Sequence, residues 1–136
     1  MGIVYADLVL KNVKDLLRAE DGLISESEIR QKTVKAIVDT GAMSMVINEE
    51  LCNALGLSIT GEKGITLANN AKDVAKITGP VEIHWKNRSF VCPTLVSSAN
   101  GPILMGVIPL EGMDLMVDPV RLELVGAHGE EEVYRL

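Results

Sequence analysis

The sequence predicts a mainly antiparallel β-protein that forms a single domain with one or two short helices. Apolar and polar residues alternate with a period of two over most of the chain, and short polar or glycine-containing turns separate the alternating segments. The chain has 136 residues, of which 47% are hydrophobic and only 3% aromatic, so its core must be built from Val, Ile, Leu and Met. Such a chain is expected to close into a barrel or a closed sandwich.

The first third of the chain is expected to be largely extended. Residues 3–10 form a predicted strand, residues 13–18 are expected to continue it, and residues 20–22 form a turn. After a polar segment, the β-branched residues 33–38 predict a second strand that ends at Asp39.

A short helix is predicted over residues 48–56. Asn48 is a favourable N-cap, and two glutamates follow it at the positive end of the helix dipole. Gly56 stands where a helix commonly ends, and Leu51 and Leu55 share one face of the helix.

The middle of the chain predicts two hairpins. The first has strands at residues 65–67 and 74–78 around a polar tip, and the second has strands at residues 81–85 and 89–96. The last elements predicted are an apolar segment, a short helix and two strands, over residues 103–106, 107–112, 115–118 and 120–125. Residues 1–125 therefore form the predicted domain, and residues 126–136 an acidic tail that is a candidate interface strand.

Composition argues against several classes of function. The net charge is −6 and Lys and Arg form no block, so neither nucleic acid nor a membrane surface is an expected partner. No run reaches the roughly 18 apolar residues of a membrane span, and the first residues do not have the pattern of an export signal, so a cytoplasmic location is expected. Cys52 and Cys92 are expected to be reduced and buried, and their spacing to His84 and His128 matches no zinc pattern. We therefore expect no metal and no cofactor.

The most informative stretch is Asp39-Thr40-Gly41-Ala42, which apolar residues flank on both sides. A carboxylate in such surroundings is costly to bury unless it is paired or has a chemical role. The Asp supplies an acid/base group, the Thr a hydroxyl and the Gly a close backbone approach. The triplet alone is also compatible with an acidic turn at a strand end, so its context decides between the two interpretations.

In that context the chain resembles the retroviral-type (retropepsin-like) aspartic proteases, and more closely the small bacterial and archaeal members of that clan. The resemblance covers roughly residues 3–125 and rests on the segments 38–42, 55–57, 65–69, 103–111 and 115–119. It implies a closed β-barrel, a homodimer and a peptide or protein substrate, with residues 2–5 and 133–136 as the candidate strands of the dimer interface. It also implies that Asp39, Thr40 and Gly41 are catalytic, with Thr40 bonding across the subunit interface.

Aspartic-protease chemistry needs two carboxylates in one site, one ionised as base and one protonated as acid. The chain contains one D-T-G triplet, so the second carboxylate must come from another copy. Two carboxylates ~3 Å apart repel by roughly 5 kcal/mol at an effective dielectric constant near 20, so the pair keeps one proton over a wide pH range. A water between two Asp39 side chains is then expected to attack the peptide carbonyl without a covalent intermediate.

The same resemblance implies which residues contact substrate. These are Ala42 and Met43 beside the triplet, and Ala68, Asn69, Asn70 and Ala71 at the tip of the first hairpin, which serves as a flap that closes over the substrate. The alternative for the flap is an ordinary exposed turn. Met43 and Val107 depart from the viral pattern, which has a polar residue and often an Arg there.

Two other functions for the whole chain remain open. One is a retropepsin-fold dimer that binds peptides without cutting them, and the other is a structural protein with an incidental triplet. Asp114 and Asp118 are weaker candidates for the second acid, whereas His84 and His128 are expected to be solvated surface residues. The methionines with apolar neighbours are expected to pack in the core, namely Met43, Met45, Met105, Met113 and Met116.

Overall fold

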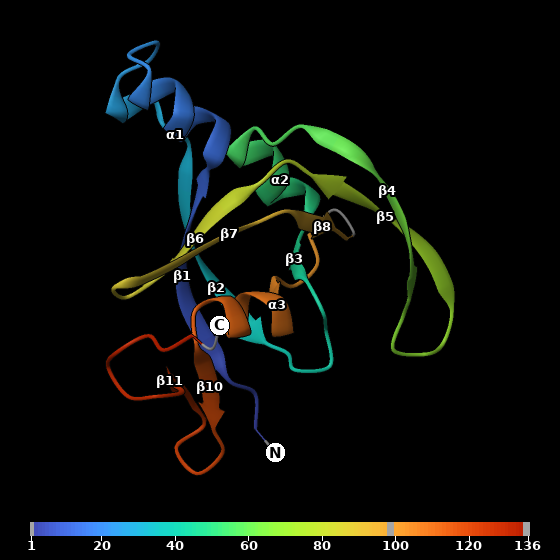
Figure 1. The fold of residues 1–136 in the computed structure, drawn as a ribbon. Helices are drawn as coiled ribbons and strands as arrows, with labels where there is room; N and C mark the ends of the chain where they lie inside the picture. Colours follow the sequence, from blue (N-terminus) through green and yellow to red (C-terminus); the bar gives the residue numbers. More distant parts are fainter. Residues whose placement is uncertain (1, 98–99, 135–136) are drawn as a thin grey trace.

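A computed structural model describes residues 2–97 and 100–134 of the chain. Nine strands form one sheet in the order β4-β5-β8-β3-β9-β2-β1-β6-β7, and two more form the separate hairpin β10–β11 (Figure 1). The strands are β1 (Tyr5–Asn12), β2 (Gln31–Val38), β3 (Met45–Ile47), β4 (Ile59–Thr66), β5 (Lys72–Thr78), β6 (Val81–Trp85), β7 (Arg88–Cys92), β8 (Thr94–Val96), β9 (Leu104–Met105), β10 (Leu115–Asp118) and β11 (Glu123–Gly126).

Four short helical segments connect the strands in the described part of the chain. They are α1 (Val13–Glu20), the 3₁₀ turn η1 (Glu26–Glu28), α2 (Glu49–Leu55) and α3 (Val107–Gly112). None of the helices within residues 2–97 and 100–134 has the length and apolar character needed to cross a membrane.

The sheet is mostly antiparallel, as predicted, but it is open. Strand β1 pairs antiparallel with both β2 and β6, whereas β2 pairs parallel with β9, and β3 parallel with β8. Strands β4 and β7 lie at the two ends of the order, so the closed barrel expected from the sequence is not found in the described residues. The predicted strand over residues 89–96 divides at Pro93, where the missing N–H interrupts the ladder, and β8 pairs with β3 and β5 instead.

The prediction that residues 13–18 are extended is wrong, because this segment forms α1. The side chain of Asn12 accepts a hydrogen bond from the backbone N–H of Asp15 and caps the helix, while its amide donates to the Leu55 carbonyl at 2.8 Å. The buried Asp15 carboxylate also accepts two bonds from the Arg30 guanidinium, at 2.8 and 3.0 Å. The local cap and the long-range bonds together favour a helix where the alternation of residues suggested a strand.

Other local predictions are confirmed. In α2, the Asn48 side chain accepts a hydrogen bond from the N–H of Leu51 at 2.8 Å, and Gly56 ends the helix with φ 62°. The first hairpin is formed by β4 and β5 and the second by β6 and β7.

The last strand begins at Glu123 and not at Val120, because residues 119–122 form the turn of the β10–β11 hairpin.

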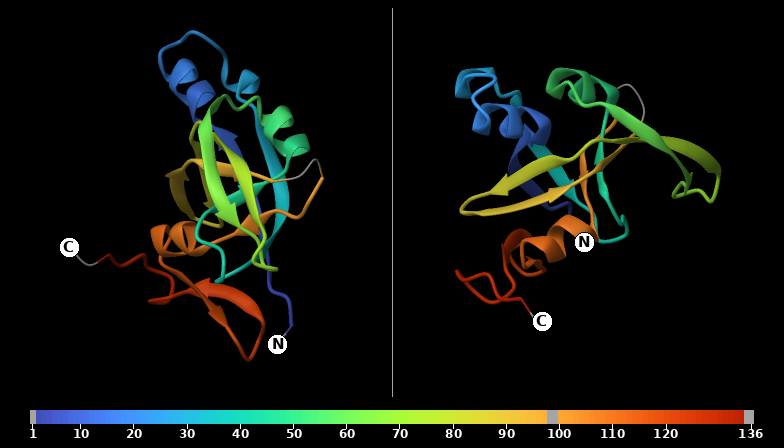
Figure 2. Two further views of the ribbon diagram at one scale, coloured as in Figure 1. Left: turned by 90° about the vertical axis from the view of Figure 1, so that its right-hand side faces the viewer. Right: turned by 45° about the horizontal axis from the view of Figure 1, so that its top comes forward.

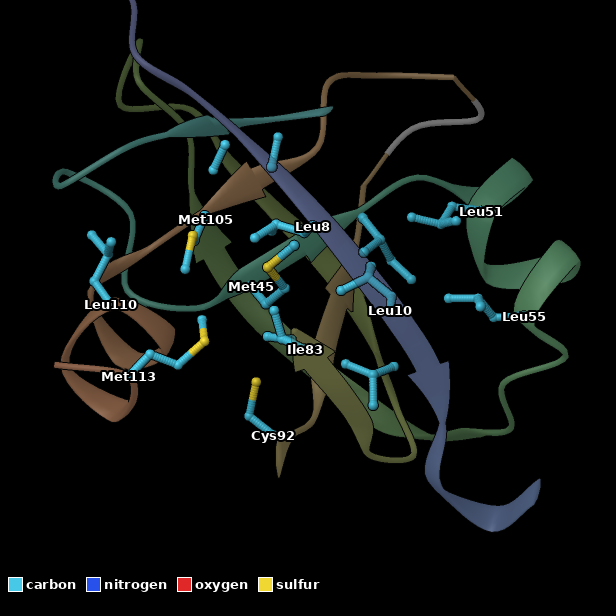
Figure 3. Packing of buried hydrophobic residues seen from close by; sticks show 14 of the residues in the cluster. Leu8, Leu10, Met45, Leu51, Leu55, Ile83, Cys92, Met105, Leu110 and Met113 are labelled. Atoms are coloured by element: carbon cyan, nitrogen blue, oxygen red, sulfur yellow. The ribbon is translucent and has the colours of Figure 1, made fainter. Parts of the chain in front are cut away.

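Aliphatic residues and methionines fill the core between the sheet and the helices (Figure 3). Met45, Met105 and Met113 are fully buried, and Cys52 and Cys92 are buried and free. Met43 and Met116 are exposed, which corrects the prediction that they pack in the core. Met116 alternates with the buried Leu115 on β10, so it lies on the outer face of the hairpin.

Candidate active site

Asp39 follows directly after β2, where that strand lies beside β9. Its backbone N–H donates to the Met105 carbonyl at 3.0 Å, and its own carbonyl accepts from the N–H of Ala42 at 3.1 Å. The N–H of Gly41 donates to Oδ1 of Asp39 at 2.9 Å. The turn therefore fixes the carboxylate relative to its own backbone through Oδ1, while Oδ2 takes no part in this bond.

The segment 39–44, which we call the D-T-G loop, is tethered to the start of α3. Backbone N–H groups at the start of α3 donate to three consecutive carbonyls of the loop: Val107 to Ala42 at 2.9 Å, Ile108 to Met43 at 2.9 Å and Gly106 to Ser44 at 3.1 Å. These bonds hold the loop on the helix that follows β9.

Gly106 is a positioning residue that the sequence analysis did not single out as part of the site. A Cβ atom at this position would lie 2.4 Å from the Ser44 carbonyl oxygen and 2.6 Å from that of Ala42. Both contacts are with backbone, which cannot rotate away, so only glycine allows the loop to lie this close. The available signal was a glycine between an apolar strand and a short helix, in the same element that carries the family resemblance.

The loop is accessible. Asp39 and Ala42 are partly buried, whereas Thr40 and Gly41 are exposed and Met43 is 68% exposed. An open groove of about 400 Å³ runs past Asp39 and Thr40, between the first residues of the chain and the β10–β11 hairpin. Most of its remaining lining is apolar, with Ile3, Val4, Ile37, Val38, Val117 and Pro119.

The other predicted contact residues lie on a separate element. Ala68, Asn69, Asn70 and Ala71 are exposed at the tip of the β4–β5 hairpin, which extends toward the same end of the molecule as the D-T-G loop (Figures 1 and 2). Asn70 has φ 66°, and Oδ1 of Asn69 accepts from the N–H of Ala71 at 3.0 Å. Among the described residues no hydrogen bond joins this tip to the loop.

The two alternative second acids have other partners. Both oxygens of Asp114 accept from Nδ1 of His128, at 2.8 and 2.9 Å, and one also accepts from the N–H of Val133. The Val133 N–H and His128 lower the pKa of Asp114. Asp118 accepts two backbone N–H groups of the hairpin turn, which lower its pKa as well. Each carboxylate is therefore stabilised as an anion within its own subunit.

The two histidines are less independent than the sequence suggested. His128 is more than half exposed, as expected of a surface residue, but its ring nitrogen Nδ1 is hydrogen-bonded to Asp114. His84 is partly exposed and pairs with Glu82 two residues earlier on β6. Within residues 2–97 and 100–134, no cluster of three or more His, Cys, Asp or Glu side chains is arranged to hold a metal ion.

Comparison with known proteins assigns the family. A family model described as gag-polyprotein putative aspartyl protease matches residues 25–111 of the chain. The chain belongs to this aspartyl protease family. The matched region of the aspartyl protease family includes Asp39, Gly106 and the whole β4–β5 hairpin.

Solved structures support the same fold. The chain matches 180 chains of known structure, among them the EIAV protease in complex with the inhibitor HBY-793, with a TM-score of 0.56 and 17% sequence identity. That match covers 81% of this chain and 86% of the EIAV chain. At this identity the likeness shows the retroviral-protease fold and not a shared substrate. No curated protein sequence matches the chain.

Proposed function

We propose that this aspartyl protease family member is an endopeptidase that acts as a homodimer, with Asp39 of each copy supplying one of two catalytic carboxylates. The observation that carries the proposal is the D-T-G loop, which holds one accessible carboxylate rigidly at the end of β2. The sequence contains this triplet once. A second copy related by a twofold axis supplies the missing acid in equivalent geometry.

The surroundings of the other candidate acids support this assignment. Asp114 and Asp118 each accept two or more hydrogen bonds within their own subunit, and their lowered pKa values disfavour the protonated form that a general acid needs. Asp39 of a second copy is therefore the partner that we propose for Asp39.

In the proposed reaction, the two Asp39 carboxyl groups share one proton and hold a water molecule between them. The ionised group takes a proton from the water, which attacks the peptide carbonyl carbon, while the protonated group donates to the carbonyl oxygen. The carboxyl group that took the proton from water then donates it to the peptide nitrogen, while the other carboxylate takes a proton from a hydroxyl of the tetrahedral intermediate. The C–N bond breaks, the acid and amine products leave, and the pair again holds one proton. The protein forms no covalent bond with the substrate.

The remaining predicted residues have proposed supporting roles. Thr40 is exposed beside Asp39 and is available to bond across the dimer interface, while Ala42 and the exposed Met43 border the substrate. The β4–β5 tip, from Ala68 to Ala71, is proposed to close over the peptide and exclude water. The flap differs from a glycine-rich tip in that an asparagine adopts the left-handed conformation at its turn.

Substitution of Asp39 by Asn tests the proposal. With a peptide library as substrate, the D39N variant should lose about 10²–10⁴-fold in kcat/KM, the usual contribution of a general acid or base, while its unfolding transition stays near that of the wild type. Asp7, an exposed carboxylate on β1, provides a control that removes the same charge elsewhere, so D7N should remain active. A wild-type chain that binds peptides but releases them uncut would instead support the non-catalytic binding module.

A further inference from the structure

We propose that the β10–β11 hairpin forms the contact between the two copies, with the tip residue Val120 of each copy seated in the groove beside Asp39 of the other. The inference rests on the proposed function, because only that function requires two Asp39 carboxylates to meet. It replaces the expectation that the last residues of the chain form the interface.

The tip of the hairpin exposes apolar side chains. Val120 is 90% exposed, and Leu122 adopts φ 54°, a left-handed conformation that favours glycine or asparagine over leucine. Asp118 fixes the turn by accepting the N–H groups of the two residues at its tip. A rigid turn that presents valine and leucine to solvent is better suited to a protein contact than to a free surface loop.

The groove provides a matching surface at the same end of the molecule. It lies between the N-terminal segment and the hairpin, and these two segments extend side by side from the body (Figures 1 and 2). Ile3 at its edge is 61% exposed, and Val38, Val117 and Pro119 line it together with Asp39. An apolar tip placed there would exclude water from the neighbourhood of the carboxylate.

A second copy of this chain is the occupant that best satisfies these observations. Tip and groove are neighbours on one subunit, so a twofold axis between them makes both contacts at once, each tip entering the partner's groove. The hairpin carries Asp118, Arg121 and Glu123, a net charge of −1, whereas the chain carries −6. Two copies that meet through their hairpins therefore avoid most of their mutual repulsion.

The base of the hairpin is anchored so that its tip is held in place. The Arg88 guanidinium, only 2% exposed, donates to the carbonyls of Met113 and Asp114 before β10, at 2.9 and 2.7 Å. It also donates to Gly129 after β11, at 2.6 Å. One buried side chain thus joins both ends of the hairpin to β7.

The end of the chain is engaged elsewhere. The N–H of Val133 donates to Asp114, and the Tyr134 hydroxyl donates to the Gly112 carbonyl at 2.7 Å. The sequence placed a candidate interface strand at residues 133–136, of which 135 and 136 lie outside the described residues. Since residues 133 and 134 are bound to their own subunit, the hairpin is the free element at this end of the described chain.

The first test measures self-association of the full chain by sedimentation. We expect V120D to weaken the dimer at least tenfold and to lose peptidase activity in proportion at a fixed chain concentration, with activity returning as the concentration rises. The matched control is L23D, which adds the same charge at an apolar residue that is 73% exposed in the turn after α1, at the far end from the hairpin. L23D should match the wild type, whereas a V120D dimer as tight as the wild type overturns the inference.

The second test asks where the tip lies. V120C and I3C are made in separate chains, mixed and oxidised, so that a disulfide between these positions can form only between subunits. A cross-linked heterodimer is expected, and none should form when L23C replaces V120C; no cross-link between V120C and I3C overturns the arrangement. If V120D stays dimeric while D39N is inactive, the interface is wrong and the proposed function stands. If V120D dissociates but D39N is as active as the wild type, the proposed function is wrong and the interface stands.

Discussion

Replacing Gly106 with alanine should displace the D-T-G loop without changing the chemistry of any proposed catalytic group. The glycine adopts φ −87°, which alanine tolerates, so the effect would come from contact and not from backbone strain. The added methyl group would lie 2.4 Å from the Ser44 carbonyl oxygen and 2.6 Å from the Ala42 carbonyl oxygen. Ordinary van der Waals contact is near 3.4 Å or more, so the loop must move by up to about 1 Å.

The size of the effect follows from that displacement. Overpacking a buried contact destabilises a protein by about 1–3 kcal/mol, and a shift of about 1 Å in a catalytic group lowers the rate by about 10²-fold. The hydrogen bonds from Gly106, Val107 and Ile108 to the loop would lengthen together, because all three lie at the start of one helix. At a temperature where G106A is still fully folded, we therefore expect its kcat to be lower than that of the wild type, and the loss of stability cannot account for this decrease.

Urea unfolding and peptidase kinetics on the same preparations test this expectation. The control is G61A, because a methyl group at Gly61 meets no atom within 4 Å and its backbone is not left-handed. G61A should retain both stability and activity within a few-fold of the wild type. If G106A is as stable and as active as G61A, the tether between α3 and the D-T-G loop does not position the carboxylate.

Three further measurements test the surroundings of the site. Arg30 lowers the pKa of the buried Asp15, so the pair stabilises the fold at pH values above the ordinary pKa of an aspartate, about 3.9. This stabilisation is lost as the pH falls through the lowered pKa. R30M should therefore unfold at a lower urea concentration than the wild type at pH 7, and this difference in urea midpoint should shrink toward pH 2. Burial raises the pKa of Cys92 to about 11, so its thiol should react slowly with a disulfide reagent at pH 8 until urea unfolds the chain, and fast labelling without urea would contradict its burial. N12A removes both the cap of α1 and the bond to Leu55, and it should cost about 1–3 kcal/mol in urea unfolding, with a neutral result excluding these bonds as determinants of α1.

Elements with local signals were predictable from the sequence. Helix α2 carries its cap residue at Asn48 and its terminating glycine at Gly56, and the structure uses both as the sequence suggested. Helix α1 carried a similar local signal that the sequence analysis missed, because Asn12 caps it by accepting from the N–H of Asp15, three residues later. The bonds to partners 43 and 15 residues away add to this cap and could not be predicted from the sequence. The open order of the sheet also depends on distant pairs, since β9 lies between β2 and β3 and joins them through parallel and antiparallel ladders.

For the site, chemistry was easier to predict than position. The Asp39 triplet could be identified from the sequence because a carboxylate between apolar residues is costly unless it is paired or has a chemical role. The family match supports this interpretation. The role of Gly106 could not be predicted, because the need for a glycine is apparent only when the backbone that it approaches is known. His128 is a surface residue as predicted, but its contact with Asp114 could not be predicted, because Asp114 lies on a different element of the fold.

Helix α3 connects the two parts of the proposal. Its first residues hold the D-T-G loop, and it ends at Gly112, just before Met113 and Asp114, whose carbonyls accept hydrogen bonds from Arg88 ahead of β10. A helix of six residues is too short to bend appreciably, so the hairpin and the loop are linked as one rigid unit. A dimer contact at the hairpin would therefore set the separation of the two carboxylates. The two ends of this unit should then differ in their effects: G106A should lower kcat in an intact dimer, whereas V120A, which adds no charge beside Asp39, should mainly weaken the dimer and lower kcat per assembled dimer less than G106A does. Equal effects of both variants on kcat per dimer would contradict the link.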